Sequence, residues 1–194
     1  MRNTHKAGKL FVISASSGAG KTSLVNNAIK RLAPDIDIKR VVTYTTRAPR
    51  PHEVHGQDYY FISHDEFNKK LKEGFFLESS TYDGHQYGSP QVQYDLLQGT
   101  SLLLITDRAG AKEVHRQIGQ AVLIWILAPD VETLKQRMIS RETETHTQIE
   151  RRLKIAIQEM EEENKQHFFE YHLVNDDFER SLEELILIIH DELG

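Results

Sequence analysis

The residues with the clearest chemical potential form one short segment, Ala15-Ser16-Ser17-Gly18-Ala19-Gly20-Lys21-Thr22. The segment follows an apolar run at residues 10–13 and precedes a helical pattern that begins at Ser23. This strand–loop–helix context is typical of a phosphate-binding loop, whose backbone N–H groups and helix end surround phosphate oxygens. The spacing G-x-x-x-x-G-K-[ST] is kept, except that Ala15 stands where the first glycine is usual. The segment therefore predicts a site for a nucleoside triphosphate.

The polar groups of this loop have separate expected tasks. Lys21 can reach the β- and γ-phosphates, and the Thr22 hydroxyl can ligate Mg²⁺. Gly18 and Gly20 allow the backbone to turn its N–H groups inward. The expected ATP subsite therefore comprises Ala15, Ser16, Ser17, Gly18, Ala19, Gly20, Lys21, Thr22 and Ser23.

Composition limits the classes to which the chain can belong. Its 194 residues suit one domain or one core with an insertion, and 39% hydrophobic with 27% charged residues is ordinary for a globular protein. No apolar stretch approaches the roughly 20 residues of a membrane helix, and no signal peptide is indicated at the N-terminus. The net charge of −5 argues against a nucleic-acid surface, and the absence of cysteine excludes disulfides. We expect a cytoplasmic protein with no membrane or nucleic-acid partner.

The order of predicted elements indicates the fold class. Short apolar runs that read as buried strands lie at residues 10–13, 41–43, 101–105, 121–127 and 172–174. Helical patterns lie between and after them, at residues 22–32, 109–117, 131–140, 147–166 and 181–192. Strands that alternate with helices predict an α/β fold with a parallel sheet covered on both faces.

The stretch from Arg47 to about Leu97 interrupts this alternation. Short extended pieces rich in tyrosine, phenylalanine and glycine surround one helical pattern, which opens with a capping box at Ser63 and runs to Lys72. About 50 residues make a poor separate core, so we interpret the stretch as an α/β insertion. The charge run at residues 159–163 is interpreted as a solvated helix face.

A second segment, Thr45-Thr46-Arg47-Ala48-Pro49-Arg50 to Tyr59, adds groups that suit another phosphate. Arginine binds phosphate as a bidentate fork, and a tyrosine hydroxyl adds a neutral donor. The pattern T-T-R-x-P-R-x-x-E-x-x-G-x-D-Y resembles the GMP-recognition segment of guanylate kinases. The resemblance extends over nearly the whole chain, through Phe76-Leu77-Glu78, Tyr87-Gly88-Ser89, residues 141–153 and Val174-Asn175-Asp176-Asp177.

The resemblance implies a GMP subsite. Arg47, Arg50, Tyr59 and Tyr87 match the residues that hold the GMP phosphate, and Glu78 matches the carboxylate that reads guanine. A carboxylate can accept from guanine N1–H and the exocyclic amine together, a donor pair that adenine does not present. Thr43, Ser89 and Asp107 complete the expected set.

The resemblance also implies a lid around residues 138–152. Its arginines, Arg141 and Arg152, would surround the migrating phosphoryl group together with Lys21 and Arg47, and these four are the expected catalytic residues. Arg137 and Asn175 match positions near ATP, although Asn175 has an equally good interpretation as a cap after the last strand.

One position departs clearly from the family pattern D-x-D followed by glutamine and glycine. Ile105 replaces the first carboxylate and Ala109 the glutamine, so that only Asp107 remains to support Mg²⁺, directly or through water. His52, Ser79-Ser80 and Glu142 are smaller departures, for which the sequence offers no account. The effect of Ile105 on substrate choice stays open.

Together the resemblance implies a P-loop nucleoside-monophosphate-kinase fold with a five-stranded parallel sheet, a GMP-binding insertion at about 43–97 and a helical lid. The core would then span residues 8–42 and 98–194. The expected reaction is Mg²⁺-dependent phosphoryl transfer from ATP to GMP, and dGMP is an expected second acceptor. Two alternatives remain: a kinase of another nucleotide or a ribose bisphosphate, and a non-catalytic module that resembles this family and binds peptides or phosphoproteins. Oligomeric state cannot be predicted from these residues.

Overall fold

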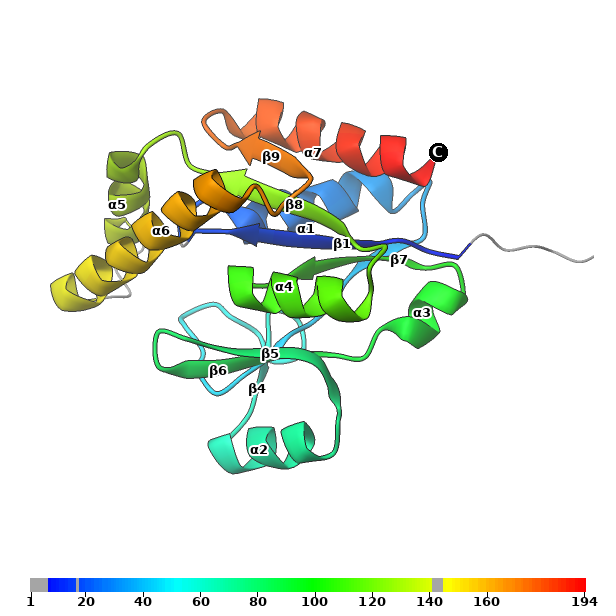
Figure 1. Ribbon diagram of the computed structural model, residues 1–194, viewed down its shortest axis with the longest axis horizontal. Coiled ribbons are helices and arrows are strands. Elements are labelled where there is room, and N and C mark those ends of the chain that lie inside the picture. Colours follow the sequence, from blue (N-terminus) through cyan, green and yellow to red (C-terminus); the bar gives the residue numbers. More distant parts are fainter. Residues whose placement is uncertain (1–6, 17, 141–144) are drawn as a thin grey trace, which may run out of the picture.

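The computed structural model describes residues 7–16, 18–140 and 145–194, apart from the side chains of Tyr94 and Leu97. Its centre is a five-stranded parallel sheet in the order β2-β7-β1-β8-β9 (Figure 1). The strands are β1 (Leu10–Ala15), β2 (Ile38–Arg40), β7 (Ser101–Ile105), β8 (Val122–Leu127) and β9 (Tyr171–Val174). The expected α/β class and the five-stranded parallel sheet are confirmed.

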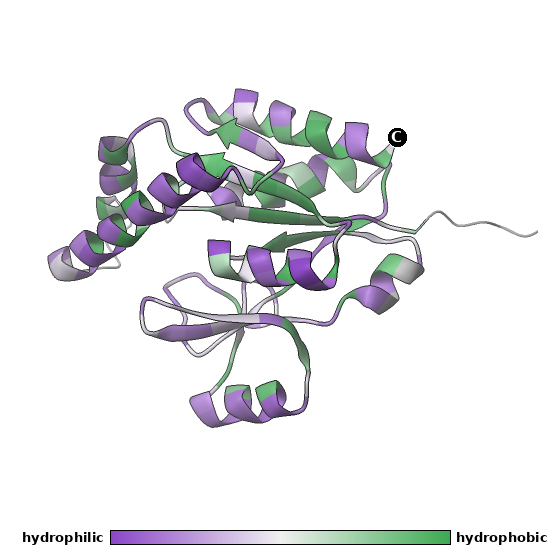
Figure 2. Cartoon of the chain, viewed as in Figure 1, coloured by the Kyte–Doolittle hydropathy of each residue, from purple (hydrophilic) through white to green (hydrophobic). Residues whose placement is uncertain are grey.

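Alternation along β1 explains why the sheet is covered on both faces. Phe11 and Ile13 point into one apolar core, whereas Leu10 and Val12 point into another. The first core is closed by α1 (Lys21–Leu32) and α7 (Phe178–Leu193), and the second by α4 (Arg108–Gln117). Figure 2 shows the central strands as hydrophobic, with polar residues on the outer helices. A strand buried on both faces must be apolar throughout, as the sequence of β1 is.

The remaining helices of the core begin at polar caps. The Asp130 side chain caps α5 (Val131–Ile139), and Thr145 forms a capping box with Gln148 at the start of α6 (His146–Gln166). Asp107 and Asp177 cap α4 and α7 in the same way. Side-chain acceptors at these positions satisfy N–H groups that the first helical turn leaves unpaired.

The second sheet is built from the middle of the chain. Its four strands run in the order β4-β3-β6-β5, with β3 (Tyr44–Thr45), β4 (Tyr60–Phe61), β5 (Phe76–Tyr82) and β6 (His85–Pro90). The short helix α2 (His64–Lys72) begins at Ser63, whose side chain accepts from Glu66 N–H. A two-residue turn joins β5 to β6, with φ of 50° at Asp83 and 81° at Gly84. Figure 1 shows this sheet on the side of α4, and α3 (Gln93–Leu97) leads back to the core.

Two expectations about elements are corrected. The strand predicted at residues 41–43 lies earlier, at Ile38–Arg40, although Val41 N–H still donates to the Leu103 carbonyl. The chain leaves the central sheet after Val41 because Tyr44 and Thr45 pair with strands of the second sheet. Helix α7 starts at Phe178 rather than at residue 181, because Asp177 provides the cap. No described helix is long and apolar enough to cross a lipid bilayer.

Candidate functional site

A cleft of about 610 Å³ lies at the carboxyl end of the central strands, where parallel α/β sheets usually bind their ligands. The phosphate-binding loop and the ends of β1 and β7 line one side of it. The segment from Arg47 to Pro51, the β5–β6 hairpin and α6 line the rest. The structure therefore brings the two predicted phosphate-binding segments to one cavity.

Most of the predicted phosphate-binding loop lines this cleft, whereas Ser16 and Ala19 are fully buried. Gly18 and Gly20 take φ values of 92° and 91°, a left-handed conformation that favours glycine. Helix α1 begins at Lys21, and its N-cap Gly20 supplies no side-chain hydrogen bond, so its first N–H groups suit an anion. Lys21 Nζ donates to the Ala15 carbonyl at 2.9 Å, and Thr22 and Ser23 line the cleft. Ser17 lies outside the described residues.

The Asn175 side chain supports this loop through a hydrogen bond. Its side chain is buried, and Nδ2 donates to the Ala19 carbonyl at 2.7 Å. A Cβ at Gly20 would come within 2.4 Å of that nitrogen, which explains why this turn has no side chain. The backbone carbonyl of Asn175 accepts from Arg137 Nη2 at 3.0 Å, and Arg137 Nη1 is buried without a hydrogen-bond partner in the described part of the chain. Asn175 thus supports the loop and is itself held by Arg137.

Opposite the loop, Arg47 is held in place by Glu53. Arg47 Nη2 donates to the two Glu53 oxygens at 2.8 and 3.0 Å, and Arg50 N–H donates to Glu53 Oε2 at 2.7 Å. Burial is the largest single effect and opposes ionisation of Glu53, but hydrogen bonds from Arg47 and from Arg50 N–H, together with the charges of both arginines, outweigh it and lower the pKa of Glu53. The Arg47 guanidinium also lies 5.5 Å from the Tyr59 ring centroid. Arg47, Arg50, Tyr59 and Tyr87 all line the cleft, as does Thr43, which is buried.

Glu78 is an almost completely buried carboxylate without a cation. It is 2% exposed and accepts from Ser89 Oγ at 2.5 Å through Oε1. Its Oε2 is buried and makes no hydrogen bond of normal geometry to a described residue, although the Thr106 hydroxyl also favours the ionised form of this carboxylate. Burial is the largest cause and raises the pKa of Glu78 to about 7; the nearby charge of Asp107 adds to this, whereas hydrogen bonding from Ser89 and Thr106 opposes it. An acceptor left in this state is costly unless a ligand supplies a donor.

Asp107 caps α4 and lines the cleft, and its charge acts on Glu78. Its Oδ1 accepts from Gly110 N–H at 2.8 Å, and its Oδ2 accepts from Ser80 Oγ at 2.6 Å. Ser80 thus gains a role that its sequence pattern did not reveal. Ile105 ends β7 and lines the cleft, where its side chain also packs against the first apolar core. A Cβ at Gly110 would come within 2.6 Å of Glu78 Oε2, so glycine is required beside that carboxylate.

Helix α6 closes the cleft on the remaining side. Gln148 and the buried Arg152 line it, and Arg151 forms an ion pair with Asp83 in the turn between β5 and β6. The first turns of α6 therefore touch the tip of the second sheet. The predicted lid residue Arg141 lies outside the described residues.

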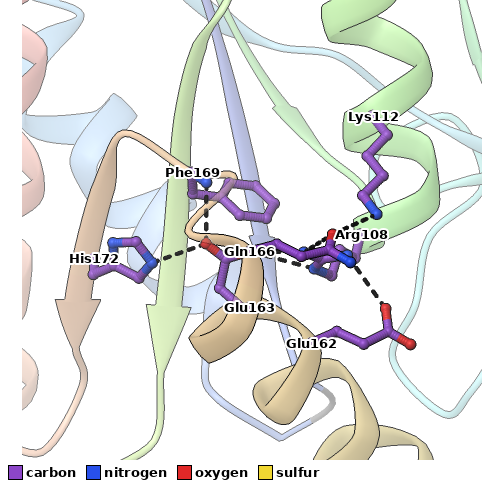
Figure 3. Close-up of polar contacts among 7 residues, drawn as sticks. All are labelled: Arg108, Lys112, Glu162, Glu163, Gln166, Phe169 and His172. Carbon is purple, nitrogen blue, oxygen red and sulfur yellow. Dashed lines mark hydrogen bonds and ion pairs between the residues drawn. The ribbon is translucent and has the colours of Figure 1, made fainter.

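The far end of α6 carries a buried ion-pair network, which Figure 3 shows. Arg108 is 4% exposed and donates to Glu163 Oε2 through Nη2 at 3.0 Å and to Glu162 at 3.2 Å. Glu163 also accepts from Phe169 N–H at 3.0 Å and lies 3.0 Å from His172 Nε2. The interpretation of residues 159–163 as a solvated face is wrong for Glu163, which is 1% exposed. Its partner Arg108 is distant in sequence, so a helical pattern could not reveal the pair.

The donors at the cleft suit Mg²⁺ that arrives with a nucleotide. No group of three or more histidine, aspartate or glutamate side chains in the described ranges could hold a metal ion. Thr22 and Asp107 are oxygen donors that line the cleft, and each Asp107 oxygen keeps a lone pair beyond its hydrogen bond. Mg²⁺ prefers few protein oxygens, with water and phosphate completing its shell. The residues therefore fit a metal held mainly by its nucleotide.

A parallel sheet with a phosphate-binding loop after β1, faced by arginines from a second sheet, defines a phosphotransferase of the phosphate-binding-loop class. The family model described as guanylate kinase matches residues 7–192. A guanylate kinase of Rubrobacter xylanophilus is 39% identical over 186 residues, which cover 95% of this chain and 94% of the relative. One of Coxiella burnetii is 40% identical over 185 residues, covering 94% and 87%.

Solved structures agree with these sequence matches. The crystal structure of guanylate kinase from Anaplasma phagocytophilum superposes with a TM-score of 0.78 at 27% identity, covering 96% of this chain and 87% of that one. The chain belongs to the guanylate kinase family. The resemblance inferred from its motifs is confirmed.

Proposed function

We propose that this protein is a catalytically active guanylate kinase that transfers the γ-phosphoryl group of ATP to GMP. The observation that carries the proposal is Glu78, a buried carboxylate beside the cleft with one acceptor atom that lacks a partner among the described residues. Guanine offers two adjacent donors on its N1 and exocyclic amine, which a carboxylate can accept together. A substrate without guanine would leave this costly group unused.

On the GMP side, phosphate recognition is assigned to residues of the second sheet and its loops. Arg47, Arg50, Tyr59 and Tyr87 supply guanidinium and hydroxyl donors for the GMP phosphate. Glu53 fixes Arg47 in advance, because its two oxygens accept from one guanidinium nitrogen. Thr43, Ser89 and Asp107 line or support the base site together with Glu78.

On the ATP side, the phosphate-binding loop holds the donor nucleotide. In this proposal the backbone N–H groups of residues 15–23, most of the described ones lining the cleft, surround its phosphates. Lys21 neutralises the β- and γ-phosphates, and Arg137 is proposed to add a donor. Asn175 acts through the loop, since it holds the Ala19 carbonyl. Thr22 and Asp107 would hold Mg²⁺, which supplies further neutralisation of phosphate charge when it is bound.

Transfer itself needs position and positive charge rather than a general base. The GMP phosphate attacks the γ-phosphorus in line, and Lys21, Arg47, Arg141 and Arg152 stabilise the charge on the transferring group. Closure of the lid around residues 138–152 excludes water, which limits hydrolysis of ATP. Our proposal retains the cytoplasmic location, with small molecules as partners.

One residue of the cleft supports a second candidate function. Ile105 places an apolar side chain on the cleft where the family pattern has a carboxylate. A shifted acceptor, either another nucleotide or a ribose bisphosphate, would account for that change. Glu78 favours GMP over this alternative.

The test is a coupled assay of ADP release with ATP and equal concentrations of GMP, dGMP, AMP, UMP and CMP. We expect GMP to be the best acceptor and dGMP the second, because Glu78 reads the base and no described residue is assigned to the 2′-hydroxyl. Turnover of AMP or UMP as fast as that of GMP would contradict the assignment. Absence of turnover with every acceptor would favour a non-catalytic module.

A further inference from the structure

Glu159 is a carboxylate of α6 that the proposed reaction does not use. It lies seven residues after Arg152 on α6, so that two helical turns place both side chains on nearly the same face. Arg152 lines the cleft, and the residue between them on this face, Ala156, is fully buried. The face of α6 that carries Glu159 is therefore turned toward the protein rather than toward solvent.

Independent contacts bring this part of α6 to Asp107. Arg108 directly follows Asp107 in the chain, and its guanidinium donates to Glu162 and Glu163, one helical turn beyond Glu159 (Figure 3). The network thus fixes the start of α4 against α6 at this level. Along α6, Glu159 lies between this network and Arg152, which lines the cleft.

Two of the charges that act on Glu159, those of Lys21 and Asp107, belong to the proposed phosphoryl-transfer site. Its carboxylate interacts electrostatically with Lys21 and Arg108, which favour its ionised form, and with Asp107 and Glu162, which oppose it. Its Oε2 is buried without a hydrogen-bond partner in the described part of the chain. Burial raises the pKa of Glu159, as expected for a carboxylate that keeps an unpaired oxygen away from water.

We propose that Glu159 makes the ATP subsite selective for the metal-bound form of ATP. The proposal rests on the proposed function, because it places ATP phosphates at Lys21. When Glu159 is ionised, its charge and that of Asp107 together repel a triphosphate that carries all of its own charge. A divalent cation on the phosphates would weaken this repulsion, and metal-bound water would supply donors to the unpaired carboxylate oxygen. Glu159 therefore acts on ATP indirectly, through the electrostatic potential at Lys21 and through hydrogen bonds with water.

The test compares binding of a non-hydrolysable ATP analogue with and without Mg²⁺, by calorimetry, in the wild type and in Glu159→Gln. We expect the variant to bind the metal-free analogue more tightly and the Mg²⁺-bound analogue no more tightly. The ratio of the two dissociation constants should fall at least about fivefold, the size of one part-buried charge interaction. Glu161→Gln is the matched control, since it removes the same charge from an exposed position on the same helix and should leave the ratio unchanged.

The outcomes separate an electrostatic role from a structural one. A purely structural role would weaken both forms of the analogue equally, and an unchanged ratio would overturn the proposal. Glu159→Leu serves as a second neutral variant, and thermal melting reports whether each variant folds. Failure of both variants to fold would also overturn the proposal. Because the readout is binding, wild-type protein that binds the analogue but does not phosphorylate GMP would contradict the proposed function alone.

Discussion

Glu78 and Glu163 are almost equally buried, at 2% and 1% exposure, yet their surroundings differ. Glu163 lies near the end of α6, where Arg108 of α4, Phe169 N–H and His172 of β9 contact its oxygens. Glu78 lies in the second sheet beside the cleft, where Ser89 Oγ satisfies one oxygen and the other has no partner among the described groups. Both oxygens of Glu163 have hydrogen-bond or charge partners, whereas Glu78 keeps one oxygen without a well-formed hydrogen bond.

The difference indicates where the fold keeps a destabilising buried group because that group serves function. A buried carboxylate with a cation and full hydrogen bonding contributes to a specific structure, whereas one without them is a cost that the fold must offset. Proteins retain such a cost mainly at sites that bind a ligand. The comparison therefore assigns Glu163 to structure and Glu78 to recognition, and the variants below test both halves of it.

The largest expected effect is on the structural side. Glu163→Gln should lower the free energy of unfolding by about 3 kcal/mol or more, because it removes the buried charge partner of Arg108 and leaves only the half-exposed Glu162. Glu162→Gln is the control, since Glu162 contacts the same arginine from a side chain that is 42% exposed, and it should cost less than about 1 kcal/mol. Denaturant unfolding measures both. Equal free energies of unfolding for the two variants would contradict the structural role assigned to Glu163.

Replacement of Glu78, on the recognition side, should instead raise the free energy of unfolding, and the size of this increase should depend on pH. Because the pKa of Glu78 is raised to about 7 in the folded protein, the folded state holds this proton more tightly than the unfolded state. The stability contributed by the protonated carboxyl is full below about pH 4.5 and is lost as the pH rises through 7. Glu78→Gln should therefore gain stability relative to the wild type between pH 5 and pH 8, by at most about 3 kcal/mol.

Unfolding of both proteins in denaturant at several pH values, without nucleotide, measures this gain. Glu161→Gln should show no trend, because residue 161 is exposed. A difference between Glu78→Gln and the wild type that stays constant from pH 5 to pH 8 would show that Glu78 is not the costly group described above.

A smaller effect is expected from a carboxylate added at the end of β7, where Ile105 lines the cleft. Ile105→Asp should change kcat/KM for GMP less than tenfold, or about 1.4 kcal/mol, because Asp107, Lys21 and the arginines already provide the charges. A new carboxylate beside Glu78 and Asp107 also adds a desolvation cost. Steady-state kinetics measures the change. A gain of tenfold or more would favour a native substrate other than GMP.

Local signals predicted the side of the molecule that binds phosphate. Gly18, Gly20 and Lys21 have fixed spacing, and the conformation of such a loop depends on residues adjacent in the chain. The apolar run at β1 fixed its place in the centre of the sheet, because only a strand buried on both faces is apolar throughout. The resemblance to a known family then supplied Glu78 and Arg47, which no local pattern distinguishes from surface residues.

Contacts between distant segments could not be predicted in this way. Glu163 sits in a charge run typical of an exposed helix, and its partner Arg108 is 55 positions away. Ser80 is a departure from the family pattern whose contact with Asp107 depends on how β5 meets the start of α4. The strand predicted at residues 41–43 was misplaced because the chain exchanges one sheet for another after Val41.

The central claim is that the unpartnered oxygen of Glu78 is kept for guanine, and calorimetric titration with GMP and IMP tests it most directly. IMP presents N1–H but lacks the exocyclic amine, so the wild type should prefer GMP by about tenfold or more. Glu78→Gln can accept through only one oxygen, so this preference should shrink to about threefold or less while the variant remains folded. The same preference for GMP over IMP in Glu78→Gln and in the wild type would contradict the account.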